Sequence, residues 1–259
     1  MTRYNLSFAG AGRVAGALCR DMYRSGHTIL QIVSETAADG KLLARECKAL
    51  WSQELIFHDL PDIIIAAVPD DRLRHVLSEI KCPEQTVVAH TAGSYGLDIF
   101  PSGLKRTGVF YPLQTFSKGR FISLRDIPFL IEASDNDTGE ILERLAISVR
   151  GKVHFIDAGL RKKIHLAAVF VCNFTNHMLT AGKKIASEAG VSFNLFEPLI
   201  RETISKALEN GPEISQTGPA VRNDIATIEK HLELLSFSPE LQNLYNEVTR
   251  SIMKHYKQA

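Results

Sequence analysis

The stretch FAGAGRVAG (residues 8–16) contains the pattern G-x-G-x-x-A directly after a short apolar run. We expect a strand over the apolar run, a tight turn at Gly10 and a helix over residues 13–26. Gly12 lets the backbone approach a pyrophosphate, and Ala15 is small enough for the helix to pack on the strand. The start of the helix then directs free N–H groups at phosphate oxygens. The pattern predicts dinucleotide binding, and the alternative is a tight turn without a ligand. The predicted phosphate loop comprises Gly10, Ala11, Gly12, Arg13, Val14 and Ala15.

Strand and helix patterns alternate over the first part of the chain. Apolar runs that predict strands occur at residues 4–10, 27–35, 61–70, 85–93, 107–113, 126–133 and 152–157. The run PDIIIAAVPD (61–70) is continuously apolar, which is typical of a parallel strand buried on both faces. From about Ala158 onwards the strand patterns disappear and helical stretches follow. We therefore predict an α/β fold, with a Rossmann-type doubly wound sheet in residues 1–157 and an all-helical domain in residues 158–259.

The composition is that of a globular enzyme without a strong charge bias. Lys and Arg number 30 against 29 Asp and Glu, which argues against nucleic acid or an anionic membrane as a partner. The four cysteines are scattered without metal-type spacing, so we predict no metal site. No run of about 18 apolar residues occurs, and the first residues lack the apolar segment of a signal peptide. We expect a cytoplasmic protein.

The choice between NAD and NADP depends on the end of the second predicted strand. An acidic residue there binds the ribose hydroxyls of NAD. The sequence has Ser34 at this position, which leaves room for a 2′-phosphate, and Glu35 follows it. Arg13, Lys41 or Arg45 would supply the counter-charge. We favour NADP, and NAD stays open because Glu35 can turn inward.

Two further strands end in polar stretches that we expect near the nicotinamide half of the cofactor. They read AAVPDD (66–71) and AHTAGS (89–94). In a doubly wound sheet, ligands lie beyond the carboxyl ends of the strands. We therefore add Val68, Pro69 and Thr91 to the predicted cofactor site. His90 lies inside an apolar strand and is more readily explained as a structural residue than as a proton donor.

Six stretches together resemble one family. They are FAGAGRVAG, IIIAAVPDD, VVAHTAGS, GVFYPLQTFS, HLAAVFVCNFTNH and QTGPAVRND, in this order over nearly the whole chain. The chain resembles the family of NADP oxidoreductases with a Rossmann-like N-terminal domain and a DUF2520 C-terminal domain. This family is similar in plan to pyrroline-5-carboxylate reductases and β-hydroxyacid dehydrogenases. The resemblance implies a helical domain that dimerises and closes over the nicotinamide, but it supplies no substrate.

One departure from the β-hydroxyacid dehydrogenases concerns their catalytic lysine. In those enzymes a lysine lies on the first long helix, four residues before an asparagine. Here Val169 lies four residues before Asn173, and Lys162 and Lys163 fall at the wrong spacing. The lysine therefore cannot be transferred to this chain.

The stretch HLAAVFVCNFTNH (165–177) predicts a helix with an uncharged polar arc. At about 100° per residue, His165, Asn173, Asn176 and His177 fall on one third of the circumference. A solvated face would carry Lys and Glu instead. The arc is interpreted as the wall of a substrate cleft, as a dimer interface, or as satisfied core groups. We rank His165 first as general acid, and Asn173 as a group that orients a substrate carbonyl.

The stretch QTGPAVRND (216–224) carries the second polar cluster. Arg222 near a helix start is suited to bind a substrate carboxylate. Asp224 would orient Arg222 or accept a proton. The alternative is that Asp224 caps the helix and Arg222 pairs with it on the surface.

These patterns together predict an NAD(P)-dependent oxidoreductase. It would act on a small carbonyl, imine or hydroxy compound that carries a carboxylate, with its site between the two domains. The rival hypothesis is a sensor or interaction module that binds NADP without turnover, because fold alone does not imply function. Apolar residues on the last helix, LYNEVTRSIMKHY (244–256), favour a homodimer.

Overall fold

The computed structural model describes residues 2–117 and 119–256, and the chain divides into two compact units, Met1–Cys172 and Asn173–Ala259. The predicted domain limit at residue 157 coincides with the change from strands to helices. The last strand ends at Phe155 and the next helix begins at Ala158. The limit between domains stays a prediction, and each compact unit is described here by itself.

The first unit contains a mostly parallel sheet, as predicted. Its strands are β1 (Asn5–Ala9), β2 (Thr28–Val33), β3 (Leu50–Ser52), β4 (Ile63–Ala66), β5 (Val87–His90), β6 (Arg106–Pro112), β7 (Pro128–Ala133) and β8 (Lys152–Phe155). The strand order is β3-β2-β1-β4-β5-β6-β7-β8. Within the described ranges, neighbouring strands run parallel except β6 and β7, which pair antiparallel. Because the order moves outward from β1 in both directions, the loops after β1 and β4 diverge, and this is where a doubly wound sheet binds its ligand.

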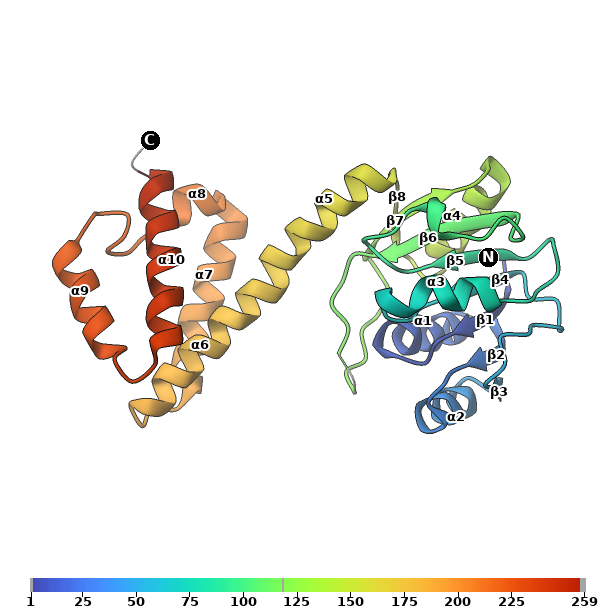
Figure 1. Cartoon of the computed structure of the whole chain (residues 1–259), viewed down its shortest axis with the longest axis horizontal. Coiled ribbons are helices and arrows are strands. Elements are labelled where there is room, and N and C mark those ends of the chain that lie inside the picture. Colours follow the sequence, from blue (N-terminus) through green and yellow to red (C-terminus); the bar gives the residue numbers. More distant parts are fainter. Residues whose placement is uncertain (1, 118, 257–259) are drawn as a thin grey trace. The chain divides into compact units, whose positions relative to one another are not determined.

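Helices connect the strands of this unit (Figure 1). They are α1 (Arg13–Arg24), α2 (Ala37–Glu46), α3 (Asp70–Glu79), the 3₁₀ helix η1 (Leu97–Ile99) and α4 (Asn136–Ser148), and a further helix, α5 (Ala158–Ala168), follows the last strand. Helices between parallel strands supply the crossovers that parallel pairing requires.

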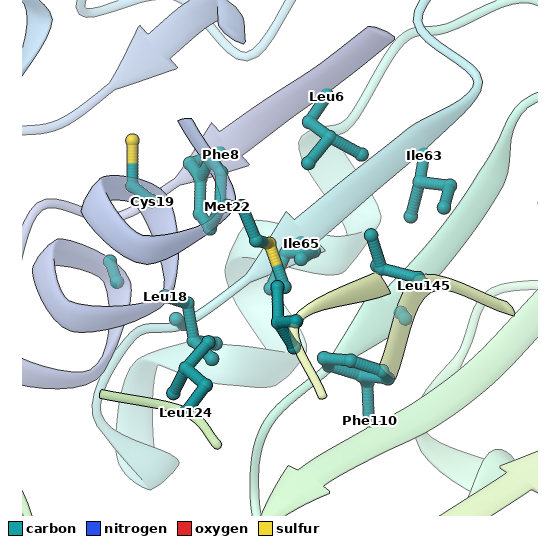
Figure 2. Packing of buried hydrophobic residues seen from close by; sticks show 14 of the residues in the cluster. Leu6, Phe8, Leu18, Cys19, Met22, Ile63, Ile65, Phe110, Leu124 and Leu145 are labelled. Carbon is teal, nitrogen blue, oxygen red and sulfur yellow. The ribbon is translucent and has the colours of Figure 1, made fainter. Parts of the chain in front are cut away.

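The core of the first unit occupies both faces of the sheet. In β4, Ile63 and Ile65 contribute to one hydrophobic cluster, whereas Ile64 and Ala66 contribute to the other. The first cluster also includes residues of α1 and α4, and the second includes residues of α3. Figure 2 shows Leu6, Phe8, Leu18, Met22, Ile63, Ile65, Phe110 and Leu145 of the first cluster. Side chains alternate between the faces of a strand, so the continuously apolar run around β4 follows from burial on both sides.

The second unit contains helices joined by turns and no strand among its described residues, as predicted. It contains α6 (Thr175–Glu188), the 3₁₀ helix η3 (Phe193–Phe196), α7 (Glu197–Asn210), α8 (Pro212–Ser215), α9 (Ile225–Leu234) and α10 (Pro239–Tyr256). Gly211 separates α7 from α8 with a φ of 89°, which a glycine adopts without strain. In residues 2–117 and 119–256, we find no helix that is both long and apolar enough to cross a membrane.

The long helix expected after Ala158 is not a continuous α-helix. A π-helix, η2 (Val169–Phe174), separates α5 from α6. A π-helical segment places more residues in each turn than an α-helix does. The single helical wheel that put His165, Asn173, Asn176 and His177 on one arc is therefore wrong.

Apolar side chains of α5 and η2 are exposed in the single chain. Leu166, Phe170 and Val171 are 59%, 60% and 75% exposed.

Candidate functional site

The phosphate loop has the backbone geometry that the glycine pattern predicts. Gly10 has a φ of 115°, and a Cβ there would lie 2.4 Å from the carbonyl oxygen of Ala67. Its N–H donates to the carbonyl of Val33 at 2.7 Å. The turn between β1 and α1 therefore requires glycine at position 10 for both conformation and space.

The start of α1 is open. Gly12 is the N-cap residue of α1, and no described atom lies within 4 Å of the place where its Cβ would be. The first turn contains no acidic residue, and no described side chain caps it. Ala15, one turn further on, is fully buried in the core. Free N–H groups at such a helix start suit a phosphate group.

A cavity of about 450 Å³ adjoins this loop. It is lined by the loop after β1, the residues after β2 and β4, and the first turns of α2 and α3. The predicted cofactor residues that line it are Gly10, Ala11, Gly12, Ser34, Val68 and Pro69. The open helix start and the cavity at the diverging loops fit a dinucleotide.

The other predicted cofactor residues lie around this cavity rather than in its lining. Arg13 lines a neighbouring cavity of about 620 Å³ together with Arg20, Arg24 and Arg120. Val14 packs partly buried against the core. The N–H of Thr91 donates to the carbonyl of Ala66 at 3.2 Å. The roles of all these residues in binding the cofactor stay predictions.

The hydroxyl of Ser34 is already hydrogen-bonded within the protein. It donates to the carbonyl of Thr36 at 3.0 Å and accepts from Nε1 of Trp51 at 3.1 Å. Glu35 faces the cavity and pairs with Arg72 of α3, with Nη2 at 2.9 and 3.1 Å from its two carboxylate oxygens. The Asp, Glu, Lys and Arg side chains among the residues that line this cavity are therefore Glu35, Arg72 and Asp39, rather than a lone basic residue.

A tyrosine–histidine pair lies beyond the carboxyl end of the sheet. The hydroxyl of Tyr111, near the end of β6, lies 2.9 Å from Nδ1 of His165 on α5. The two half-buried rings meet edge to face with their centroids 5.8 Å apart. Burial, and secondly the charge of Asp70, raise the pKa of Tyr111 above that of an ordinary tyrosine. Tyr111 therefore keeps its proton through the neutral pH range.

The loop after β5 fits closely against His165. A Cβ on Gly93 would lie 2.7 Å from Nδ1 and 2.8 Å from Cγ of the imidazole, so position 93 leaves no room for a side chain. The next residue, Ser94, donates a short hydrogen bond to the carboxylate of Asp70 at the start of α3. Segments after β4, β5 and β6 thus bring polar groups together at one edge of the sheet.

Two buried side chains hold this loop in place. His90 uses both ring nitrogens: Nδ1 accepts from the N–H of Ala92 at 3.2 Å, and Nε2 lies 3.3 Å from the carbonyl of Gly96. Burial lowers the pKa of His90 to about 4, so the ring is neutral and donates from Nε2. This geometry agrees with the structural interpretation of His90.

Arg161 is the second of these side chains. Its guanidinium is fully buried and donates to Glu132 at 2.7 Å and to the carbonyl of Tyr95 at 2.6 Å. Its Nε has no hydrogen-bond partner among the described residues. Arg161 lies one helical turn before His165, so it fixes α5 against the loop that carries Gly93.

The three other predicted catalytic residues lie in the second unit. Asn173 is exposed within the π-helix, and Arg222 is exposed before α9. Asp224 caps α9: its carboxylate accepts from the N–H of Thr227 at 3.1 Å and from the Thr227 hydroxyl at 2.8 Å. These hydrogen bonds lower the pKa of Asp224. The capping alternative describes its position, while catalytic roles for Asn173, Arg222 and Asp224 stay predictions.

The sequence interpretation missed Tyr111, Gly93, Ser94 and Asp70. Each of them lies at or after the end of a strand, and this position is the only local signal that they carry. Tyr111 stands in YPLQTFS, and the residue that it contacts, His165, is 54 positions away in the chain.

Comparisons with known proteins agree with this architecture. Residues 1–115 match the model of a Rossmann-like domain, and residues 127–252 match DUF2520, a domain of unknown function. A search of curated proteins gave no match.

Solved structures match over the full length. A protein from Bacteroides fragilis described as a putative NADP oxidoreductase is 34% identical, with a TM-score of 0.90 and coverage of 97% of this chain and 98% of that one. A reductive aminase from Aspergillus terreus, in complex with NADPH and ethyl-5-oxohexanoate, is 16% identical with a TM-score of 0.68 and coverage of 98% and 95%. A pyrroline-5-carboxylate reductase from Coxiella burnetii is 16% identical with a TM-score of 0.59 and coverage of 99% and 98%.

The last two likenesses concern the fold alone, whereas the first is a family relationship. The chain therefore belongs to the family that the Bacteroides protein represents, in which a Rossmann-like N-terminal domain precedes a DUF2520 domain.

Proposed function

We propose that this protein is an NADP-dependent oxidoreductase that reduces a small carbonyl or imine compound, or oxidises the corresponding hydroxy compound or amine. The observation that carries the proposal is the Tyr111–His165 pair. It lies beyond the carboxyl ends of strands parallel to β1, the strand that leads into the phosphate loop. The proposed dinucleotide site and this hydrogen-bonded pair would then share one edge of one sheet, as a hydride-transfer reaction requires.

The cofactor assignment is supported by the relatives. The Bacteroides protein is described as an NADP oxidoreductase, and the Aspergillus enzyme was solved with NADPH. When bound, the nicotinamide supplies or accepts the hydride. The chain's own residues orient the substrate and move the proton, with His165 as the acid–base group.

The remaining catalytic proposals concern the second unit. Arg222 would anchor a substrate carboxylate, Asn173 would orient a substrate carbonyl, and Asp224 would hold the segment before α9 through its cap. We also propose a homodimer, supported by exposed apolar side chains of the second unit. Leu199, Leu208 and Ile214 are 63%, 82% and 82% exposed. A molar mass of one chain, measured by light scattering at micromolar concentration, would overturn the dimer.

Two measurements on the purified protein test the function. Calorimetric titration with NADPH, NADH, NADP⁺ and NAD⁺ is expected to show binding with a preference for the phosphorylated forms. Loss of NADPH absorbance is then followed with cyclic imines, 2-keto acids, and ketones with and without an amine. His165→Asn is the control, because it should bind NADPH like the wild type yet turn over slowly. Absence of binding would overturn the oxidoreductase assignment, and binding without any turnover would favour the sensor hypothesis.

A further inference from the structure

We propose that the hydroxyl of Tyr111 donates the proton to the substrate, and that His165 supplies the proton that replaces it on Tyr111. This inference rests on the proposed function and changes the part that His165 plays. His165 becomes the proton source of a two-residue relay rather than the group in contact with the substrate.

The hydrogen bond between the two residues has two arrangements. With a neutral imidazole that carries its proton on Nε2, the Tyr111 hydroxyl donates to Nδ1 of His165 across the 2.9 Å contact. With a charged imidazole, both ring nitrogens carry protons. Nδ1 then donates to the Tyr111 oxygen, and the hydroxyl proton of Tyr111 becomes free for another acceptor. Protonation of His165 therefore turns Tyr111 into a donor toward the substrate.

The environment of Tyr111 keeps the hydroxyl protonated until it is used. The side chain is half-buried, and Asp70 is the charged group whose field raises its pKa. A tyrosine that resists ionisation is a donor at neutral pH rather than a nucleophile. Asp70 itself accepts a hydrogen bond from the Ser94 hydroxyl.

Gly93 explains why the imidazole is held at the hydroxyl. The ring occupies the space that a side chain on residue 93 would need, with Nδ1, Cγ and Cβ of His165 at 2.7, 2.8 and 3.1 Å from the Cβ position. His90 and Arg161 fix the loop that carries Gly93. The loop thus forms a rigid wall that keeps His165 next to Tyr111.

The step balances in atoms and electrons. In the reducing direction, the substrate carbon gains a hydride from the reduced dinucleotide, and the π bond of C=O or C=N breaks. The electron pair moves to oxygen or nitrogen, which takes the proton of the Tyr111 hydroxyl. The proton on Nδ1 of His165 moves to the Tyr111 oxygen, so Tyr111 ends neutral. His165 also ends neutral and takes up a proton from the solvent before the next turnover.

Variants at three positions test whether the proton passes from His165 through Tyr111 to the substrate. Their kinetics are measured with those test compounds that the wild type reduces. Tyr111→Phe is expected to lower kcat by about 100- to 1,000-fold, the usual contribution of a general acid, with a smaller change in KM. Tyr23→Phe, a half-buried tyrosine on α1, is the matched control and should keep the wild-type kcat. Gly93→Ala should displace the imidazole and behave like Tyr111→Phe, although both residues of the pair are still present.

Chemical rescue separates the relay from direct catalysis by His165. Removal of the ring in His165→Ala leaves space beside Gly93 for added imidazole. We expect added imidazole to restore part of kcat in His165→Ala and none in the double variant His165→Ala/Tyr111→Phe. Rescue of the double variant, or a wild-type kcat in Tyr111→Phe, would overturn the proposal.

A measurement without substrate distinguishes failure of this proposal from failure of the proposed function. The ¹⁵N resonance of Nδ1 of His165 is recorded for the wild type and Tyr111→Phe. A shift upon loss of the hydroxyl is expected, and an unchanged resonance would overturn the relay whatever the turnover. If the resonance shifts but the wild type turns over none of the test compounds, the proposed function is wrong. The proton relay, which depends on that function, is then wrong as well.

Discussion

The hydroxyl of Tyr111 and Nδ1 of His165 lie 2.9 Å apart, although 54 positions separate the two residues in the chain. The contact joins the end of the sixth strand to the helix that follows the eighth. It exists only after the sheet has formed, so the whole of the first unit contributes to the geometry of this acid–base pair.

The two glycines of the phosphate loop are expected to respond differently to alanine. Gly10→Ala should lower the free energy of unfolding by more than about 1 kcal/mol, because position 10 has a positive φ and no room for a Cβ. Gly12→Ala should change stability by less than roughly 1 kcal/mol, since its backbone is extended and the space above it is open. Urea unfolding measures both.

The affinity of Gly12→Ala for NADPH is measured by titration. Gly12→Ala should weaken binding while the protein remains folded, because the added methyl group enters the space assigned to the pyrophosphate. A Gly12→Ala protein with wild-type affinity would show that the cofactor phosphates lie elsewhere.

Glu35→Gln is expected to raise the affinity for NADPH relative to NADH by roughly 3- to 10-fold, which corresponds to about 1 kcal/mol. The change removes one negative charge from the cavity and releases Arg72 from its ion pair to meet a 2′-phosphate. Binding of 2′,5′-ADP and of 5′-AMP, measured by calorimetry, isolates this effect. Glu54→Gln is the control, because Glu54 is exposed and is not among the residues that line the cavity. Equal gains for both nucleotides would contradict the assignment.

Stability should fall between pH 6.5 and about 4 partly because of His90. Its pKa is lowered by burial to about 4, from the usual 6.5 of a histidine. The unfolded chain therefore binds the proton first as the pH falls, so the contribution is fully present above pH 6.5 and is lost towards pH 4. The loss amounts to about 3 kcal/mol at most.

Urea unfolding of the wild type and His90→Gln at several pH values tests this sign. The variant should be less stable at pH 7 and should lose less stability on acidification. Burial also lowers the pKa of His27, so some pH dependence remains in the variant. Parallel curves for the two proteins would exclude His90 as a source.

Arg222 and Asp224 are expected to act separately. Arg222→Ala should raise KM for a carboxylated substrate and leave the affinity for NADPH unchanged. Asp224→Ala should lower the melting temperature through loss of the α9 cap, whereas Asp224→Asn should keep most of the cap and the wild-type kcat. Thermal unfolding and steady-state kinetics distinguish these outcomes. A large loss of kcat in Asp224→Asn would restore the proton-acceptor role, and equal loss of substrate and cofactor binding in Arg222→Ala would make Arg222 structural.

The parts of the molecule that were predictable from the sequence are those whose signal is local. The Gly10–Ala15 loop, the continuously apolar β4 and the helical region after Ala158 each carry their pattern within a short window. The π-helix after α5 was not predictable, because hydropathy does not reveal a change in helical pitch. Tyr111 was missed because its partner is remote in sequence. The hydrogen bond between Ser34 and Trp51 likewise depends on tertiary packing and has no local signal.

The contacts of Arg161 determine where the chain can be truncated without disturbing the first unit. Its guanidinium ties together β7, the loop after β5 and the segment before α5. A fragment that ends at Asp157 would lack this cation, leave Glu132 and the Tyr95 carbonyl without their partner, and carry Tyr111 without its imidazole. The smallest autonomous piece of the first unit should therefore extend through Cys172, where the compact unit ends.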